Sequence, residues 1–202
     1  MTKMVRTGAA IALGLSVAAC SLGGMLGGGG KPPPTLLTLT PSAPAPESVA
    51  RTASAGEAVT IQLPVIPKEL RTVRVPAQVG PTAVAYIKDL QWIDTPDRLF
   101  KDLLTETVLR TTNRVVLDPK QSTLDPGLTV SGRLTSFGYE AGQGMVLVRY
   151  DAAIARAGGE QVETRRFEAR EPADGTATTV GPALNNAANR VAAEVAQWIG
   201  GR

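Results

Sequence analysis

The sequence predicts an α+β fold, in which an antiparallel or mixed sheet is packed by two main amphipathic helices in a single domain. Short strand-like runs come first, a strong helix start follows at Thr95, and three long strand-like runs precede a closing amphipathic segment. Strands interrupted by isolated helices are typical of α+β domains. A chain of 202 residues fits one such domain with flanking segments.

Residues 1–19 are typical of a secretory signal peptide. Lys3 and Arg6 precede a short apolar run that ends in small residues. The run is about ten residues long, whereas a helix that crosses the bilayer needs roughly 20. We therefore expect the segment to direct export and then to be removed.

Cys20 is the predicted site of lipid attachment. The stretch Val-Ala-Ala-Cys at 17–20 resembles the bacterial lipobox, and Cys20 is the only cysteine of the chain. It then becomes the first residue of the mature protein, and each buried methylene of its acyl chains contributes roughly 0.8 kcal/mol to membrane attachment. The alternative is an ordinary signal peptide with an incidental free cysteine.

Residues 20–34 are predicted to form a Gly/Pro-rich tether, and residues 35–202 the folded domain. Glycine dominates the first part of the tether and Pro32 to Pro34 its end. Gly-rich chains are flexible and Pro-rich ones stiffer, so the tether lets the domain stand off the membrane. Thr35 to Thr40 is a candidate first strand.

The first half of the domain combines short strands with one helix. Strand-like runs occupy 58–65, 72–75 and 84–87. Thr95 is a good N-cap, Pro96 suits the first helical position, and Asp97 complements the positive end of the helix. The predicted helix runs to about Thr111 and buries an apolar stripe: Leu99, Phe100, Leu103, Leu104 and Val108.

The second half predicts an antiparallel meander followed by a helix. The strand-like runs 128–139, 145–155 and 161–169 are joined by glycine-containing turns. The helix is predicted over 182–199, before Gly200 and Gly201. Its apolar face carries Leu184, Ala188, Val191, Val195, Trp198 and Ile199.

Composition excludes several classes of catalytic site. The chain has no histidine, which removes Ser-His-Asp and Cys-His nucleophiles and histidine-bearing metal sites. The mature chain also lacks the Ser-x-x-Lys and Gly-x-Ser-x-Gly motifs. Lys and Arg number 21 against 18 Asp and Glu, too even a balance to indicate nucleic-acid binding. We expect no enzyme activity, no cofactor and no bound metal.

Two groups of charged residues have both a functional and a structural interpretation. Four carboxylates, which could act as acid and base or bind a hard cation, also fit ordinary helix electrostatics: Asp94, Asp97, Asp102 and Glu106. Arg165 and Arg166 could bind a phosphate or lipid headgroup. The structural alternative pairs them across the sheet with Glu163, Glu168 or Asp151.

Four residues are candidate partner contacts, provided that they are exposed. Interface cores are enriched in aromatic residues and arginine. The candidates on this basis are Trp92, Tyr139, Arg149 and Tyr150. Trp92 has an alternative role as a core residue.

Three segments, 61–64, 92–99 and 183–198, follow the lipobox and the tether in a recognisable order. They comprise a strand ending in Pro64, Trp92 ahead of the helix that Pro96 begins, and a closing amphipathic helix. In this order the chain resembles the ABC-type transport auxiliary lipoproteins, of which the paraquat-inducible protein C type is the reference.

The resemblance implies an exported, lipid-anchored accessory protein that faces the periplasm. Its implied partners are the permease and ATPase of an ABC transporter that moves lipids, and an MCE-domain protein that spans the periplasm. It would dock the far end of the lipid conduit at the outer membrane, with which Ser21 after the cysteine is compatible, and a homo-oligomeric ring is one implied arrangement. The alternative function is a structural or assembly lipoprotein of the outer membrane without a transporter partner.

Overall fold

The computed structural model describes residues 35–46, 50–54, 56–121, 127–156 and 161–201. The predicted signal peptide and tether, with Cys20, lie outside these residues. The described chain forms a mixed seven-stranded sheet with two α-helices, which confirms the predicted α+β class. The elements are β1 (Val59–Ile61), β2 (Arg74–Gly80), β3 (Ala83–Gln91), α1 (Pro96–Thr111), β4 (Val116–Leu117), β5 (Leu128–Glu140), β6 (Met145–Arg156), β7 (Val162–Pro172) and α2 (Ala177–Gly200).

The long strands β5, β6 and β7 form the predicted antiparallel meander, which confirms that part of the sequence prediction. The other edge of β5 receives two parallel partners. β1 pairs with its beginning, where Val59 lies opposite Leu128, and β2 pairs with its end, where Ala77 lies opposite Tyr139. β3 then pairs with β2, and β4 with β1.

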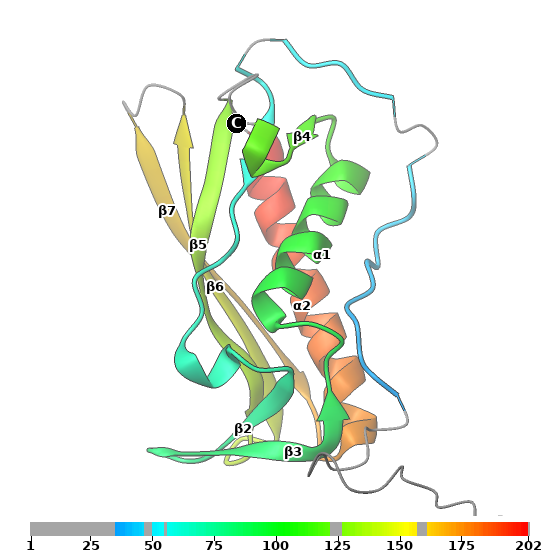
Figure 1. Ribbon diagram of the computed structural model, residues 1–202, viewed down its shortest axis with the longest axis vertical. Helices are drawn as coiled ribbons and strands as arrows, with labels where there is room; N and C mark the ends of the chain where they lie inside the picture. The colour runs from blue at the N-terminus through cyan, green and yellow to red at the C-terminus, as the bar shows by residue number, and fades with distance from the viewer. Residues whose placement is uncertain (1–34, 47–49, 55, 122–126, 157–160, 202) are drawn as a thin grey trace, which may run out of the picture. The chain divides into compact units, whose positions relative to one another are not determined.

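Both helices pack on the same face of the β5–β6–β7 sheet (Figure 1). The opposite face carries no helix of the described chain, and we call it the open face. Alternate side chains of β6 point to the helices and are buried: Val146, Val148, Tyr150, Ala152 and Ile154. Gly132 of β5 is essential to this packing, because a Cβ there would lie 2.7 Å from the Tyr150 ring and 2.4 Å from the Asp151 carbonyl oxygen.

Helix α1 begins and ends where the sequence predicts, whereas α2 begins at Ala177 and not at Pro182. Asp174 explains the earlier start, because its carboxylate accepts hydrogen bonds from the Thr176 backbone N–H at 2.9 Å and from the Thr179 hydroxyl. Pro182 lies close to the helix start, where the missing N–H removes a single helical hydrogen bond. Within the described residues, neither helix has the length and apolar character needed to cross a bilayer.

Two predicted strands are shorter than expected. The run 58–65 forms a strand only at Val59–Ile61, because Pro64 lacks the N–H that a continued ladder needs. The segment 35–40 forms a single parallel bridge between Leu37 and Trp92.

Residues 35–46 form a strap along the helices (Figure 1). The Asn189 side chain accepts from the Ser42 N–H at 2.7 Å and donates to the Thr40 carbonyl at 2.9 Å. Asn185 accepts from the Thr40 N–H at 2.9 Å, and Arg110 donates to the Ala43 carbonyl at 2.7 Å. The strap is therefore held by backbone hydrogen bonds to helix side chains.

Candidate functional site

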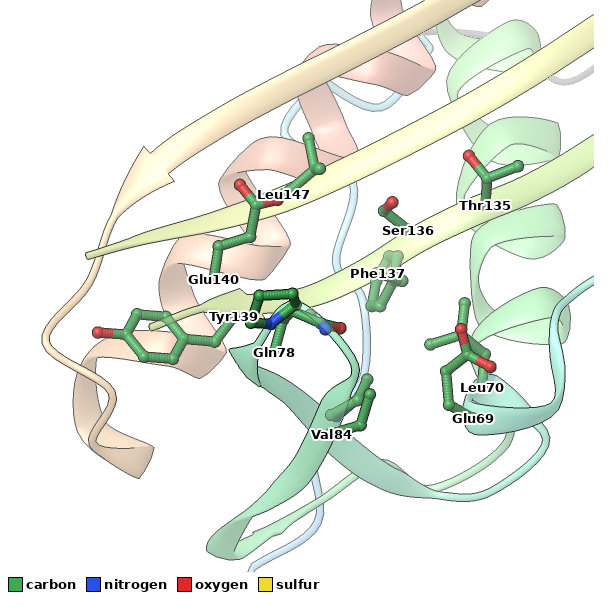
Figure 2. A pocket seen from close by; sticks show the side chains of 13 residues that line it. Glu69, Leu70, Gln78, Val84, Thr135, Ser136, Phe137, Tyr139, Glu140 and Leu147 are labelled. Carbon is green, nitrogen blue, oxygen red and sulfur yellow. The ribbon is translucent and has the colours of Figure 1, made fainter. Parts of the chain in front are cut away.

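A pocket of about 360 Å³ lies where the β2–β3 hairpin meets the second half of β5 (Figure 2). It exists because the parallel pairing of β2 with the end of β5 brings the hairpin beside this strand. The approach is close: a Cβ at Gly138 would lie 2.5 Å from the Pro76 carbonyl oxygen. The lining residues are Glu69, Leu70, Pro76, Gln78, Pro81, Val84, Thr135, Ser136, Phe137, Gly138, Tyr139, Glu140 and Leu147.

The pocket lining is mixed in polarity. Leu147 is almost fully buried although its neighbours Arg149 and Asp151 lie on the open face. Val84 is exposed on the hairpin, and Glu69 and Glu140 supply carboxylates. Such a lining suits a ligand or a partner side chain that is partly apolar and carries hydrogen-bond donors.

A chain of ion pairs leads from the pocket across the open face. Glu140 lies 3.6 Å from the Arg170 Nε, and Arg170 also donates to Glu168. Glu168 accepts in turn from the Arg149 Nε at 2.7 Å. The open face is therefore ordered and charged, with both signs side by side.

These pairs lower the pKa of the acidic partners. The Arg149 hydrogen bond, followed by that of Arg170, lowers the pKa of Glu168 below its usual range. The hydrogen bond from Arg166, 2.5 Å from the carboxylate oxygen, lowers the pKa of Asp151 in the same way. Both carboxylates are thus held in the charged form near neutral pH.

The four predicted partner contacts lie in two different environments. Trp92 is 1% exposed and Tyr150 0% exposed, so the condition of exposure is not met for either residue. Trp92 packs edge-on against Phe137, with ring centroids 5.5 Å apart, and Tyr150 packs against Phe100 at 5.2 Å. Both are core residues of the described domain.

Tyr139 and Arg149 lie at the surface. Tyr139 borders the pocket, but its ring points away from Glu69 and Val84 (Figure 2), toward the turn at Gly175. Arg149 is part of the ion-pair chain on the open face. The structure thus places Arg149 on the open face. Tyr139 lies opposite Val146 in the sheet, so its side chain is on the helix side, where it packs against the edge of the core. Trp92 and Tyr150 lie beneath the sheet.

The structure pairs several of the charged groups that the sequence singled out. Arg166 pairs with Asp151 across the sheet, which confirms the cross-strand interpretation for that residue. Arg165 instead lies over the Phe167 ring, 5.1 Å from its centroid. The predicted carboxylate cluster is spread along α1, where Asp94 pairs with Arg98 at 3.5 Å and Glu106 with Arg110 at 2.8 Å. Across the described ranges, no three acidic, histidine or cysteine side chains gather as metal ligands.

Of the residues that line the pocket, sequence reasoning singled out only Tyr139 and missed the others, Glu69 and Glu140 among them. Their proximity depends on the pairing of β2 with β5, two strands that lie far apart in the sequence. The only local signal was the turn at Gly80 and Pro81. This turn indicates a hairpin but does not indicate which strand the hairpin packs beside.

The fold and this surface define a class, namely an α+β domain whose sheet is covered on one side and presents a charged face and a pocket on the other. The family model for the ABC-type transport auxiliary lipoprotein component matches residues 37–196. The chain therefore belongs to the family of ABC-type transport auxiliary lipoproteins, which confirms the resemblance drawn from the sequence.

Two solved structures share this fold. A Xanthomonas campestris protein of the family model DUF330 is 14% identical, with a TM-score of 0.69 over 82% of this chain and 94% of that one. A second protein, described as uncharacterized, is 14% identical, with a TM-score of 0.57 over 74% of this chain and 96% of that one. No curated protein sequence matches this chain.

Proposed function

We propose that this protein is a periplasm-facing, acyl-anchored accessory subunit of an ABC-type lipid transport system. In this role it docks an MCE-domain partner at the outer membrane and performs no chemistry itself. The family match over residues 37–196 is the observation that carries the proposal, since that family comprises auxiliary lipoproteins of ABC-type transport systems. The export signal and Cys20 support the anchor.

The open face and its pocket are the docking surface in this proposal. The surface combines Arg149 and its ion-pair partners with the apolar side chains of the pocket, and arginine beside apolar groups is typical of protein interfaces. Its paired charges favour a partner of complementary charge and set the orientation of docking. Arg149 is its most informative residue, because it is partly exposed on this face and belongs to the ion-pair chain.

Co-purification from cells that express the neighbouring transporter genes tests the docking role. We expect Arg149→Ala to weaken recovery of the MCE-domain partner about fivefold or more, as a hot-spot residue does. Arg98→Ala is the matched control, because it also removes an arginine from an exposed ion pair but lies on α1. Equal loss in the control, or no loss in Arg149→Ala, contradicts docking on this face.

Labelling with a radioactive fatty acid tests the anchor separately. The wild-type chain is expected to incorporate label and Cys20→Ala to incorporate none. Equal incorporation in both chains contradicts attachment at Cys20. Neighbouring reading frames that encode no permease, no ATPase and no MCE-domain protein favour the structural lipoprotein instead.

A further inference from the structure

The strap enters the domain beside a pair of exposed aliphatic side chains. Leu36 is 50% exposed and Ile93 is 62% exposed. They are neighbours because Leu37 bridges to Trp92: the Leu37 N–H donates to the Gln91 carbonyl at 2.8 Å, and the Ile93 N–H donates to the Leu37 carbonyl at 2.8 Å. The two aliphatic side chains thus lie at the point where the described chain begins.

Side-chain alternation explains why these residues face outward. Leu37 and Trp92 pack on the core, so the adjacent residues of each extended segment point to the opposite side. Burial follows this pattern, because Leu90 and Trp92 are buried while Ile93 is exposed. The Leu37–Trp92 bridge therefore fixes Leu36 and Ile93 on one outward surface, which we call the entry surface.

The length of the tether limits how far the entry surface lies from the predicted acyl anchor. Residues 21–34 separate Cys20 from Thr35. As a flexible coil, such a segment spans roughly 20 Å. The 24 residues of α2 extend about 36 Å by comparison. In Figure 1 the strap begins near β3 and the first turns of α2, and the C-terminus of the chain lies at the opposite end.

The same end of the domain carries a further exposed aliphatic residue. Val79 is exposed on the β2–β3 hairpin, which lies at this end in Figure 1. Lys88 and Asp89, the exposed charges of β3, offset one another. An acyl anchor at Cys20 would hold these few side chains close to lipid, at a high effective concentration.

We propose that the entry surface, Leu36 and Ile93, rests on the lipid bilayer that holds the acylated Cys20. This inference rests on the proposed anchor and adds the orientation of the domain. The β3 end faces the anchoring membrane, and the C-terminal end of α2 faces away from it. The bilayer is favoured as the occupant because a short tether starts at this surface and because the surface is aliphatic.

A fluorescent label placed at single cysteines tests the contact. The full-length acylated chain has no free thiol, because Cys20 is its only cysteine and carries the lipid. Ile93→Cys is the test position. Val162→Cys is the matched control, because Val162 is 60% exposed and begins β7, whose first residues lie at the opposite end of the domain in Figure 1. Each variant is labelled with nitrobenzoxadiazole and reconstituted into phosphatidylethanolamine–phosphatidylglycerol vesicles that contain a spin-labelled quencher lipid.

We expect at least threefold stronger quenching at position 93 than at position 162. A label at Thr38→Cys, an exposed neighbour in the strap, is expected to lose most of its quenching when Leu36 and Ile93 are both changed to Asn. Equal quenching at 93 and 162, or unchanged quenching at 38 in the double variant, overturns the inference. Protection of the position 93 label by the MCE-domain partner, without lipid quenching, assigns the entry surface to a protein and also overturns it.

Intact mass distinguishes a failure of this inference from a failure of the proposed anchor. A mass that lacks the acyl groups means that Cys20 is not a lipid anchor, and the entry surface then has no membrane to face. If the chain is acylated but the label at position 93 is not quenched, the proposed anchor stands and only the proposed orientation of the domain is overturned.

Discussion

Along β6, successive residues meet two different environments. Val148, Tyr150 and Ala152 lie under the helices and are buried, whereas Arg149 and Asp151 lie on the open face in ion pairs. The covered face excludes water, so its stability depends on the apolar area that it buries. The open face keeps its charges partly solvated, and ion pairs of that kind contribute little to folding. One strand thus combines a face that stabilises the domain with a face that is available to a partner.

The covered side accepts polar groups where its hydrogen bonds are made. Asn189 is 6% exposed, and its amide bonds to the strap on both its oxygen and its nitrogen. Its nitrogen also donates to the Asn185 carbonyl at 2.9 Å. A buried amide with all these bonds fixes the strap in one register on α2.

Removal of Phe100 is expected to have the largest effect. This side chain is fully buried on α1, with its ring 5.2 Å from that of Tyr150. Phe100→Ala leaves a cavity under the sheet and should lower the free energy of unfolding by about 3–5 kcal/mol. Urea unfolding of the domain measures this change, and a loss below about 1 kcal/mol contradicts the importance of the covered face.

Removal of Asn189 is expected to have an intermediate effect. Asn189→Ala leaves the Ser42 N–H and the Thr40 carbonyl without their side-chain partner, at a cost of about 1–3 kcal/mol. Asn185→Ala is the control on the same helix, because it removes one exposed hydrogen bond and should cost about 0.5–1.5 kcal/mol. Amide hydrogen exchange at Ser42 should accelerate in the first variant, and unchanged exchange there contradicts the role of Asn189.

Local signals explain which parts of the fold were predictable. The sequence Thr95-Pro96-Asp97 contains an N-cap residue type, a first-turn proline and an acid that suits the helix dipole, so the bounds of α1 were predicted correctly. Thr95 occupies the N-cap position, although its side chain makes no capping hydrogen bond. The meander was predictable from alternation and glycine turns. The predicted start of α2 at Pro182 was wrong. The hydrogen bond from the Thr176 N–H to Asp174 lies outside the apolar pattern on which the prediction rested.

The site was less predictable, because it depends on contacts between distant strands. Arg149 lies between Val148 and Tyr150, so alternation along the strand puts its side chain on the sheet face opposite to theirs. Aromatic type did not separate Tyr139 from Tyr150, since both cores and interfaces are rich in aromatic residues. Alternation would have separated Arg149 from Tyr150, whereas the pocket required the parallel pairing of β2 with β5.

The acidic groups of the open face provide a pH test of the comparison. Arg149 lowers the pKa of Glu168 in the folded protein, whereas the pKa of a glutamate in an unfolded chain is about 4.3. A carboxylate whose pKa is lower when folded stabilises the fold above its unfolded pKa. That stabilisation is lost as the pH falls through the folded pKa. This dependence of stability on pH is specific to the open face, because Phe100 on the covered face takes part in no ion pair.

The smallest expected effect is therefore a coupling energy that disappears in acid. A double-mutant cycle of Arg149→Ala and Glu168→Gln should give about 0.2–1 kcal/mol at pH 7, because both side chains are about one-third exposed and solvent screens the pair. The coupling should decrease as the pH falls through the lowered pKa of Glu168 in the folded protein, because the protonated side chain no longer pairs with Arg149 as an anion. The loss caused by Phe100→Ala should stay nearly constant over the same range, because Tyr150, the titratable group against that ring, stays protonated in acid and burial raises its pKa further. A coupling above about 2 kcal/mol, or one that does not change as Glu168 becomes protonated, means that the open face contributes to folding as the covered face does.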